Sequence, residues 1–302
     1  MPPRRASRQS QSFIAKRRTR AIVLSVTGVI SLSLAVFIVS KISSMDSLAI
    51  TEVGVAGVET GMEADALRAA ALESLQGEYL GMFDRANTLI YPKRSIVARI
   101  SREFPWVGSV DVSREGAHSI ELVVSEKEPA ALVCATFPDF NGTDLSLEDP
   151  GSCYFADGGG FIFKKAPSFS GNVYRRYYMP ALAIDASTTD AIIGTTASTS
   201  VGFRELEKFY VSVAEQGITS DAILVKPDGE YELYARNLAS DTSAATTIVI
   251  YFDDSSSLEE QATNLVSFWR HMAEKARTEK RVFKFDSIDV RYGANVFYRE
   301  NK

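Results

Sequence analysis

Histidine and cysteine are scarce in this chain of 302 residues, which contains two of each. The histidines, His118 and His271, lie far apart in the sequence, and the cysteines, Cys134 and Cys153, do not form a Cys-x-x-Cys pair. Protein metal sites and redox-active dithiols need these residue types at close, regular spacing. The sequence therefore contains no pattern for a metal centre, and we expect no bound metal or other cofactor.

The usual catalytic signatures are also missing. The chain contains no Gly-x-Ser-x-Gly, His-Glu-x-x-His, Gly-x-Gly-x-x-Gly or Ser-x-x-Lys pattern. The glycines of Asp157–Gly160 lack the Gly-Lys-Ser/Thr ending of a phosphate loop and are typical of a β-turn. The carboxylate pair Asp253 and Asp254 is compatible with a carboxylate-dependent hydrolase. A role at the start of the helix that Ser257 caps is the better account of the pair. We therefore expect a protein that is not an enzyme.

Acidic residues are absent from the first 45 positions, whereas residues 1–20 contain seven lysines and arginines. Between them and Asp46, residues 21–42 carry no charge until Lys41, and twenty such residues make a helix of about 30 Å, the thickness of a bilayer's hydrocarbon core. A cleaved signal peptide is the alternative, but its apolar region is usually shorter. The positive-inside rule predicts a cytoplasmic tail without regular structure (1–20), one transmembrane helix (21–42) and an exterior part (43–302).

The exterior part contains 25 basic and 38 acidic residues, a net charge of −13. Nucleic acids and anionic membrane surfaces are bound by basic patches, so this balance argues against nucleic acid as a partner. We also expect no small-molecule substrate. Both cysteines lie in this exterior part, where an oxidising environment favours a disulfide between Cys134 and Cys153 that closes the loop 135–152. Two buried free thiols are the alternative.

Residues 43–126 read as a domain with the order β-α-α-β-β. A β-branched strand at 48–58 precedes a helix that opens with the capping box Thr60 and Glu63. Residues 82–88 read as a connector, and a second helix runs from Pro92 to Phe104. Two alternating strands, 106–114 and 118–126, form a hairpin whose apolar face covers the helices.

Residues 127–302 read as a second domain, so the predicted fold class is α+β. Strands are expected at 130–134, 153–164, 218–225, 231–235 and 246–252, with helices starting at Phe203 and Ser257. The segment 165–200 reads as irregular, and its cluster Tyr174–Tyr178 as surface packing. The chain closes with 284–290 and 294–298, either as two strands or as one strand kinked at Gly293.

Four stretches in this order resemble the FtsQ/DivIB family of bacterial cell-division proteins. They are ITEVGVAGV, FPWVGSVDVSREGAHSIELVVSEKEPAALV, CYFADGGGFIF and FDSIDVRYGANVFYRE, all behind a basic tail and a single apolar segment. The resemblance covers nearly the whole chain and implies a POTRA domain at 43–126 and a C-terminal β domain at 127–302. The Cys-bounded loop and residues 165–200 have no counterpart in that pattern.

The resemblance also implies a function. Proteins of this family are non-enzymatic scaffolds of the divisome at the division septum, anchored in the cytoplasmic membrane and bound to FtsB and FtsL. The partner adds a strand to the edge at the end of the second domain, and the matching positions here are Arg291, Tyr292, Val296 and Tyr298. Arg291 is expected to pair with a partner carboxylate, and Tyr292 and Tyr298 to supply contact area. Two alternatives stay open: these residues only complete the sheet core, or the chain is a membrane-anchored POTRA chaperone or polypeptide-transport component.

Overall fold

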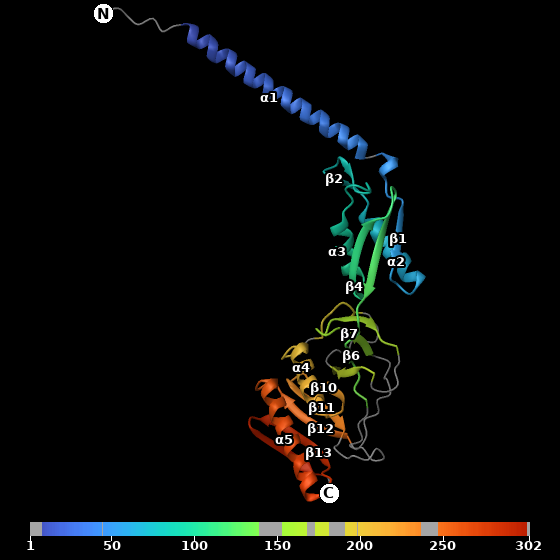
Figure 1. Cartoon of the computed structure of the whole chain (residues 1–302), viewed down its shortest axis with the longest axis vertical. Helices are drawn as coiled ribbons and strands as arrows, with labels where there is room; N and C mark the ends of the chain where they lie inside the picture. Colours follow the sequence, from blue (N-terminus) through green and yellow to red (C-terminus); the bar gives the residue numbers. More distant parts are fainter. Residues whose placement is uncertain are drawn as a thin grey trace, which may run out of the picture. The chain divides into compact units, whose positions relative to one another are not determined.

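The computed structural model describes most of the chain, namely residues 8–43, 45–138, 153–167, 173–180, 191–197, 199–236 and 247–300. The chain divides into two compact units, Met1–Ser125 and Glu126–Lys302, each with its own elements (Figure 1). Most of the loop 135–152 and parts of the segment 165–200 lie outside the described residues. As predicted, the fold is α+β, with one apolar N-terminal helix and a large mixed sheet.

The first unit begins with α1 (Arg8–Ser43), a helix of 36 residues. Its segment Arg20–Ser43 is long and apolar enough to cross a membrane, and it contains the predicted anchor 21–42. The expectation that residues 1–20 lack regular structure is wrong for 8–20, because α1 already starts at Arg8. Extending a helix adds a hydrogen bond per residue without a new nucleus, so a polar segment next to a stable helix readily joins it.

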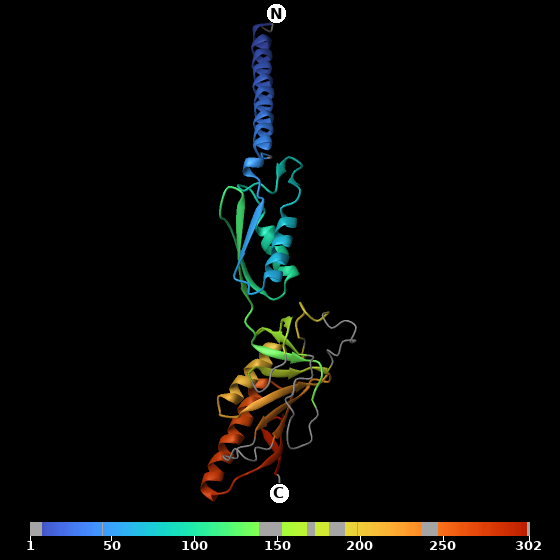
Figure 2. The same cartoon turned by 90° about the vertical axis from the view of Figure 1, so that its right-hand side faces the viewer.

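After α1, the first unit forms a three-stranded sheet with two helices on one face (Figure 2). The middle strand β5 lies between β4 and β1, and it runs parallel to β1. These elements follow one another in the predicted order, with the bounds β1 (Glu52–Ala56), α2 (Gly61–Ser74), α3 (Lys93–Glu103), β4 (Val107–Arg114) and β5 (Ser119–Glu126).

The core of this unit follows the predicted apolar periodicity. Alternate residues of β5, Ile120, Leu122 and Val124, are buried. They pack against the apolar faces of the two helices, formed by Leu67, Ala71, Ile96 and Ile100. The predicted N-cap is confirmed, since the backbone N–H of Glu63 donates to Thr60 Oγ1 (3.3 Å), while the Glu63 carboxylate accepts from the Thr60 hydroxyl (2.9 Å).

Two local expectations for the first unit need correction. The predicted strand 48–58 is regular only in β1, and it is preceded by a 3-10 turn, Asp46–Leu48. The segment around the predicted connector 82–88 contains a small hairpin of β2 (Glu78–Tyr79) and β3 (Phe83–Asp84). Strands of two residues are too short for a periodic sequence signal, so pattern reading missed them.

The second unit is built on a nine-stranded mixed sheet. Its strand order is β14-β13-β12-β11-β10-β9-β6-β7-β8. The pairs β12–β13, β9–β10 and β6–β9 are parallel, and the remaining neighbours are antiparallel. The bounds are β6 (Ala131–Cys134), β7 (Cys153–Ala156), β8 (Ile162–Lys165), β9 (Arg175–Tyr178), β10 (Ser220–Val225), β11 (Glu230–Arg236), β12 (Thr247–Asp253), β13 (Phe285–Tyr292) and β14 (Asn295–Glu300).

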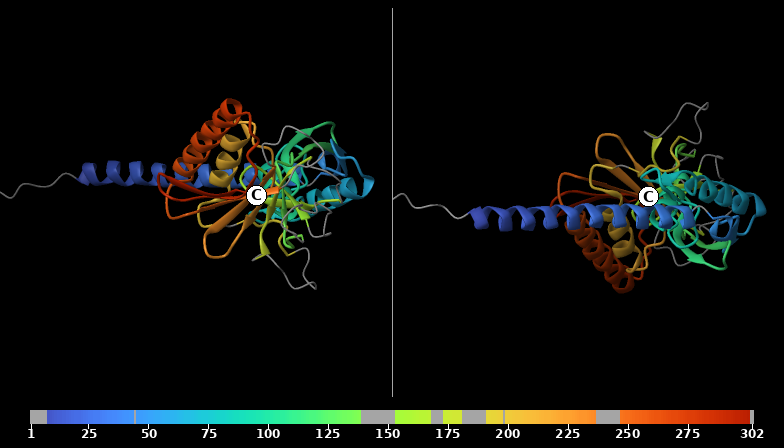
Figure 3. Two further views of the ribbon diagram at one scale, coloured as in Figure 1. Left: turned by 90° about the horizontal axis from the view of Figure 1, so that it is seen from below. Right: turned by 90° about the horizontal axis from the view of Figure 1, so that it is seen from above.

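Helices α4 (Phe203–Ala214) and α5 (Leu258–Glu279) lie side by side on one face of this sheet (Figure 3). The core under them is aromatic: Phe252 stacks on Phe209 of α4, with ring centroids 4.1 Å apart, and on Tyr231 at 5.1 Å. The predicted start of α5 is confirmed, because Ser257 Oγ accepts a hydrogen bond from the backbone N–H of Glu260 at 3.1 Å.

The largest error of sequence reading concerns the cluster Tyr174–Tyr178. Residues 175–178 form β9, an inner strand between β10 and β6, and the side chains of Tyr177 and Tyr178 are fully buried. The Tyr177 hydroxyl donates to Glu207 Oε1 of α4 (2.6 Å), and Arg175 forms an ion pair with the same carboxylate. Two arginines next to tyrosines suggest a surface, but here the polar groups of Arg175 and Tyr177 are bound by a helix that is distant in sequence.

The two cysteines are joined by a disulfide. Cys134 of β6 lies opposite Cys153 of β7 in the sheet.

At the chain end, β13 and β14 are two antiparallel strands joined at Gly293, which has a φ of +60°. Of the two readings left open for this segment, the hairpin is therefore correct.

Candidate partner-binding edge

Strand β14 forms one border of the nine-stranded sheet. It pairs with β13 on one side, and within the described part of the chain no strand pairs with its other side. Natural edge strands are usually protected by proline, central charges or bulges. The middle of β14, Val296-Phe297-Tyr298, carries neither charge nor proline. The backbone N–H and C=O groups on the free side of β14 are therefore a place where an added strand fits.

Aromatic side chains flank this edge on both faces of the sheet. Tyr292 and Phe297 lie against each other in an edge-to-face arrangement, with ring centroids 5.3 Å apart, and are 57% and 56% exposed. Tyr298 lies on the opposite face, with its ring 5.3 Å from Phe268 of α5 and 5.6 Å from Phe285. Exposed aromatic pairs next to an open edge offer contact area at a small entropic cost.

Val296 shares the helix-covered face with Tyr298, since alternate residues of a strand point the same way. It is partly buried and packs against the main core. Of the residues expected to bind a partner, Val296 therefore contributes to the core, whereas Tyr298 contacts the rings of Phe268 and Phe285 and stays 48% exposed. Tyr292 projects from the other face together with Phe297, which sequence reasoning did not single out. The alternation around Val296 and Tyr298 was a signal that could have placed Phe297 on the outer face.

Arg291 is bound by carboxylates of its own chain. Its Nη2 lies 2.6 Å from Asp289 Oδ2 and its Nη1 lies 2.8 Å from Glu230 Oε1, while the guanidinium sits 5.5 Å from the ring centroid of Tyr251. The hydrogen bonds that Arg291 donates to Asp289 raise the pKa of Arg291, although partial burial opposes this. The guanidinium of Arg291, which was expected to pair with a carboxylate of the partner, is thus paired with Asp289 and Glu230 of its own chain.

A network of paired charges continues from Arg291 across the sheet face that does not carry α4 and α5. Lys226 Nζ lies 2.5 Å from Glu232 Oε1, and the Tyr234 hydroxyl donates to Glu232 Oε2 at 2.6 Å. The hydrogen bond to Glu232 raises the pKa of Lys226, and burial raises that of Tyr234 well above its ordinary value. These groups stabilise one another, which leaves the aromatic pair as the distinctive feature of the edge.

The histidines and the carboxylate pair lie elsewhere. Asp253 Oδ1 accepts hydrogen bonds from the backbone N–H (3.1 Å) and hydroxyl (2.7 Å) of Ser255, so it organises the turn before α5. His118 is exposed with its Nδ1 3.0 Å from Ala49 O, and His271 is exposed on α5. Across the described ranges, no group of three or more His, Cys, Asp or Glu residues is placed to hold a metal ion.

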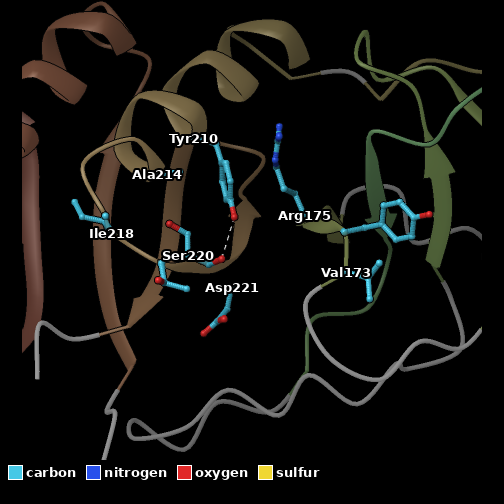
Figure 4. A pocket seen from close by; sticks show the side chains of 10 residues that line it. Val173, Arg175, Tyr210, Ala214, Ile218, Ser220 and Asp221 are labelled. Carbon is cyan, nitrogen blue, oxygen red and sulfur yellow. Dashed lines mark hydrogen bonds between the residues drawn. The ribbon is translucent and has the colours of Figure 1, made fainter. Parts of the chain in front are cut away.

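A cavity of about 400 Å³ lies between the start of β10 and the segment before β9 (Figure 4). The Tyr210 hydroxyl donates to Ser220 O (3.0 Å), the Arg175 guanidinium lies 5.1 Å from the Tyr210 ring, and Asp221 pairs with Arg236 at 3.2 Å. Its charged groups are thus neutralised by their own chain, and the cavity is a weaker candidate than the β14 edge.

Comparison of the chain with protein-family models and with curated proteins finds no match in either. The class of protein is therefore defined by the fold itself: an α+β chain with one apolar N-terminal helix and a mixed sheet. The described part of that sheet ends in an unpaired edge strand.

Proposed function

We propose that this chain is a single-pass membrane scaffold of the bacterial division complex, a protein of the FtsQ/DivIB type. Its first unit serves as the POTRA domain and its second as the C-terminal β domain. The edge of β14 recruits FtsB- or FtsL-like partners by strand addition and so supports septum formation. The N-terminus lies in the cytoplasm and both units lie outside the cytoplasmic membrane.

The observation that carries the proposal is the open edge of β14 with the exposed pair Tyr292 and Phe297 beside it. In strand addition the main-chain hydrogen bonds supply affinity with little demand on sequence, and alternate side chains supply specificity. A partner strand laid along β14 brings alternate residues over Phe297 on one face and next to Tyr298 on the other. Apolar residues at those positions are the expected chemistry of the partner.

The order of parts supports the family assignment. An apolar helix precedes a β-α-α-β-β unit, and the sheet unit that follows ends with the hairpin whose sequence resembles the closing segment of the family. Arg291 has a different role in this proposal from the one the resemblance implied. It fixes the end of β13 to β11 through Glu230, and it leaves partner contact to the aromatic residues.

Co-purification of the full chain with a co-expressed FtsB/FtsL-type partner tests the mechanism. Removing residues 293–302 deletes β14, and Phe297→Asp places a charge beside the edge; both are expected to abolish capture. Val211→Asp is the matched control, because Val211 is an exposed apolar residue on α4 and its replacement should leave capture intact. Undiminished binding after removal of residues 293–302 would refute strand addition.

A second measurement separates the scaffold from the chaperone alternative. A division scaffold captures its partner and concentrates a fluorescent fusion at the septum of dividing cells. A POTRA chaperone binds many unrelated extended peptides and shows no such localisation. Broad peptide binding together with an even distribution along the membrane would reject the proposed function.

A further inference from the structure

The end of α1 is surrounded by exposed apolar side chains of the first unit. We call them the juxtamembrane rim: Met45, Tyr79, Leu80, Met82, Leu89 and Ile90. In the range 45–138, the other exposed large hydrophobic residues are Met62, Leu72 and Val123, and they lie on other elements. Contiguous exposed apolar surface marks an interaction site, whereas scattered single residues do not.

Two hydrogen bonds hold the rim next to the last turn of α1. The Ser40 hydroxyl donates to Met82 O (2.6 Å), and Asn87 Nδ2 donates to Ser43 O (3.0 Å). Ser40 and Ser43 belong to the apolar segment Arg20–Ser43. Nineteen helical residues separate Ala21 from Ser40, a rise of about 29 Å, so a membrane-spanning α1 brings Met82 to the boundary between acyl chains and headgroups.

The tip of the β2–β3 hairpin exposes apolar surface, which is unfavourable in water. Leu80 at this tip is 86% exposed. Next to the rim, a cavity of about 350 Å³ is lined by Val39 and Ile42 of α1 and by Tyr79, Leu89 and Ile90 of the rim. Apolar residues of α1 and of the rim therefore line one shared cavity.

We propose that the juxtamembrane rim inserts into the leaflet that α1 leaves, with Leu80 and Leu89 among the acyl chains and the cavity filled by lipid. The polar groups nearby suit this position. The Arg85 guanidinium lies 5.6 Å from the Tyr79 ring and Lys41 Nζ lies 5.9 Å from the Phe37 ring. Aromatic rings and basic side chains are enriched at the headgroup level, where an apolar body and a polar end are both accommodated.

The inserted hairpin gives the first unit a second attachment to the bilayer besides α1. A second attachment limits how far the first unit can tilt relative to the bilayer. The proposal requires that α1 crosses the bilayer and is independent of any protein partner at β14.

The test uses the purified full chain in phospholipid nanodiscs, with no other protein present. Single cysteines are introduced by Leu80→Cys and Leu89→Cys and are labelled with a nitroxide, while the native cysteines stay bridged. Met62→Cys is the matched control, because Met62 is an equally exposed apolar residue (84%) at the start of α2. Leu32→Cys, in the middle of α1, reports whether the helix is inserted.

Spin-label collisions with oxygen, which concentrates in lipid, are compared with collisions with a water-soluble nickel chelate. We expect labels at 80 and 89 to lose nickel collisions and gain oxygen collisions, as at 32, while the label at 62 shows the reverse. Labels at 80 and 89 that behave like the one at 62, with 32 in lipid, would overturn the rim proposal alone. Protection from both reagents would also overturn it, because the rim would then be covered by protein.

Discussion

Gly160 lies in the turn between β7 and β8, with a φ of +81°. Its backbone N–H donates to Asp157 O (2.9 Å), and a Cβ at this position would lie 2.6 Å from Cγ of Phe203 at the start of α4. Gly158 lies in the same turn but has open space around it. The two glycines therefore have different roles: Gly160 admits close packing of a helix, whereas Gly158 only forms the turn.

Gly160→Ala is expected to destabilise the second unit by about 2–4 kcal/mol, because left-handed strain adds to overpacking against Phe203. Gly158→Ala should change the free energy of unfolding by less than about 0.5 kcal/mol. Denaturant unfolding in a Trp106→Phe background, followed by the fluorescence of the buried Trp269, measures both. Equal effects of the two substitutions would contradict the assigned packing.

Tyr177 links β9 to α4 through a hydrogen bond to Glu207. Burial first, and then the charge of Glu207, raise the pKa of the Tyr177 phenol well above its ordinary value of 10.0. The folded state therefore keeps a proton that the unfolded state loses above about pH 10. The stabilisation due to this raised pKa is fully present below pH 10 and is lost as the pH rises further.

Tyr177→Phe is expected to lower stability at pH 8 by about 1 kcal/mol, the net value of one hydrogen bond. Above pH 10 the wild type should lose stability faster than the variant, by up to about 1.4 kcal/mol per pH unit. The advantage of the wild type should therefore vanish near about pH 11. Urea unfolding at several alkaline pH values measures the difference, and parallel profiles for the two proteins would contradict the argument.

At the level of elements, the sequence predicted the longer helices and strands, in which apolar residues recur at a regular spacing. Helices α2 and α5 were found with their caps, and β4 and β5 were found by alternation. Strand β9 was missed because its sequence, Arg-Arg-Tyr-Tyr, is typical of a surface. Its polar groups can be buried only because residues distant in sequence, such as Glu207, bind them. The hairpin β2–β3 was missed because two residues carry no period.

The sequence predicted the strand that carries the candidate site, but not the contacts that its residues make. The closing strand follows from the sequence pattern, whereas Tyr292 and Tyr298 were named through the resemblance to the closing segment of the FtsQ/DivIB family. The partners of Arg291 do not follow from the sequence pattern, because Glu230 is 61 residues away in the chain and is brought near by the sheet order. Phe297 gains its importance from the edge position of β14, which only the assembled sheet reveals.

The disulfide joins neighbouring strands β6 and β7 and closes a segment in which Cys134 and Cys153 are separated by 19 positions. Constraining such a loop in the unfolded chain is worth about 3 kcal/mol. Reductant is therefore expected to lower the free energy of unfolding of the second unit by about that amount. In the double variant Cys134→Ala, Cys153→Ala, reductant should have no effect. An equal shift in both proteins would show that the reductant acts elsewhere.

At the scale of the whole chain, the proposed orientation accounts for both the distribution of charge and the disulfide. The seven basic residues of 1–20 precede the apolar residues 21–40 of α1, while the part after Lys41 has a net charge of −13 and contains both cysteines. Basic residues next to a spanning helix are retained in the cytoplasm, where thiols are kept reduced. In the proposed orientation the second unit lies in the oxidising compartment, where a disulfide such as that between Cys134 and Cys153 persists.

The same bond serves as a built-in reporter of topology. Replacing the seven basic residues of the tail by asparagine removes the charge difference across α1, so a fraction of the chains should insert in the opposite direction and carry free thiols. Lys41→Asn is the control, because it removes a positive charge from the other end of the helix and should leave all chains bridged. Cells are quenched with acid, free thiols are alkylated with a maleimide of high mass, and the fraction shifted on a gel is measured. A tail variant that stays fully bridged would show that the basic residues do not determine the orientation of the chain.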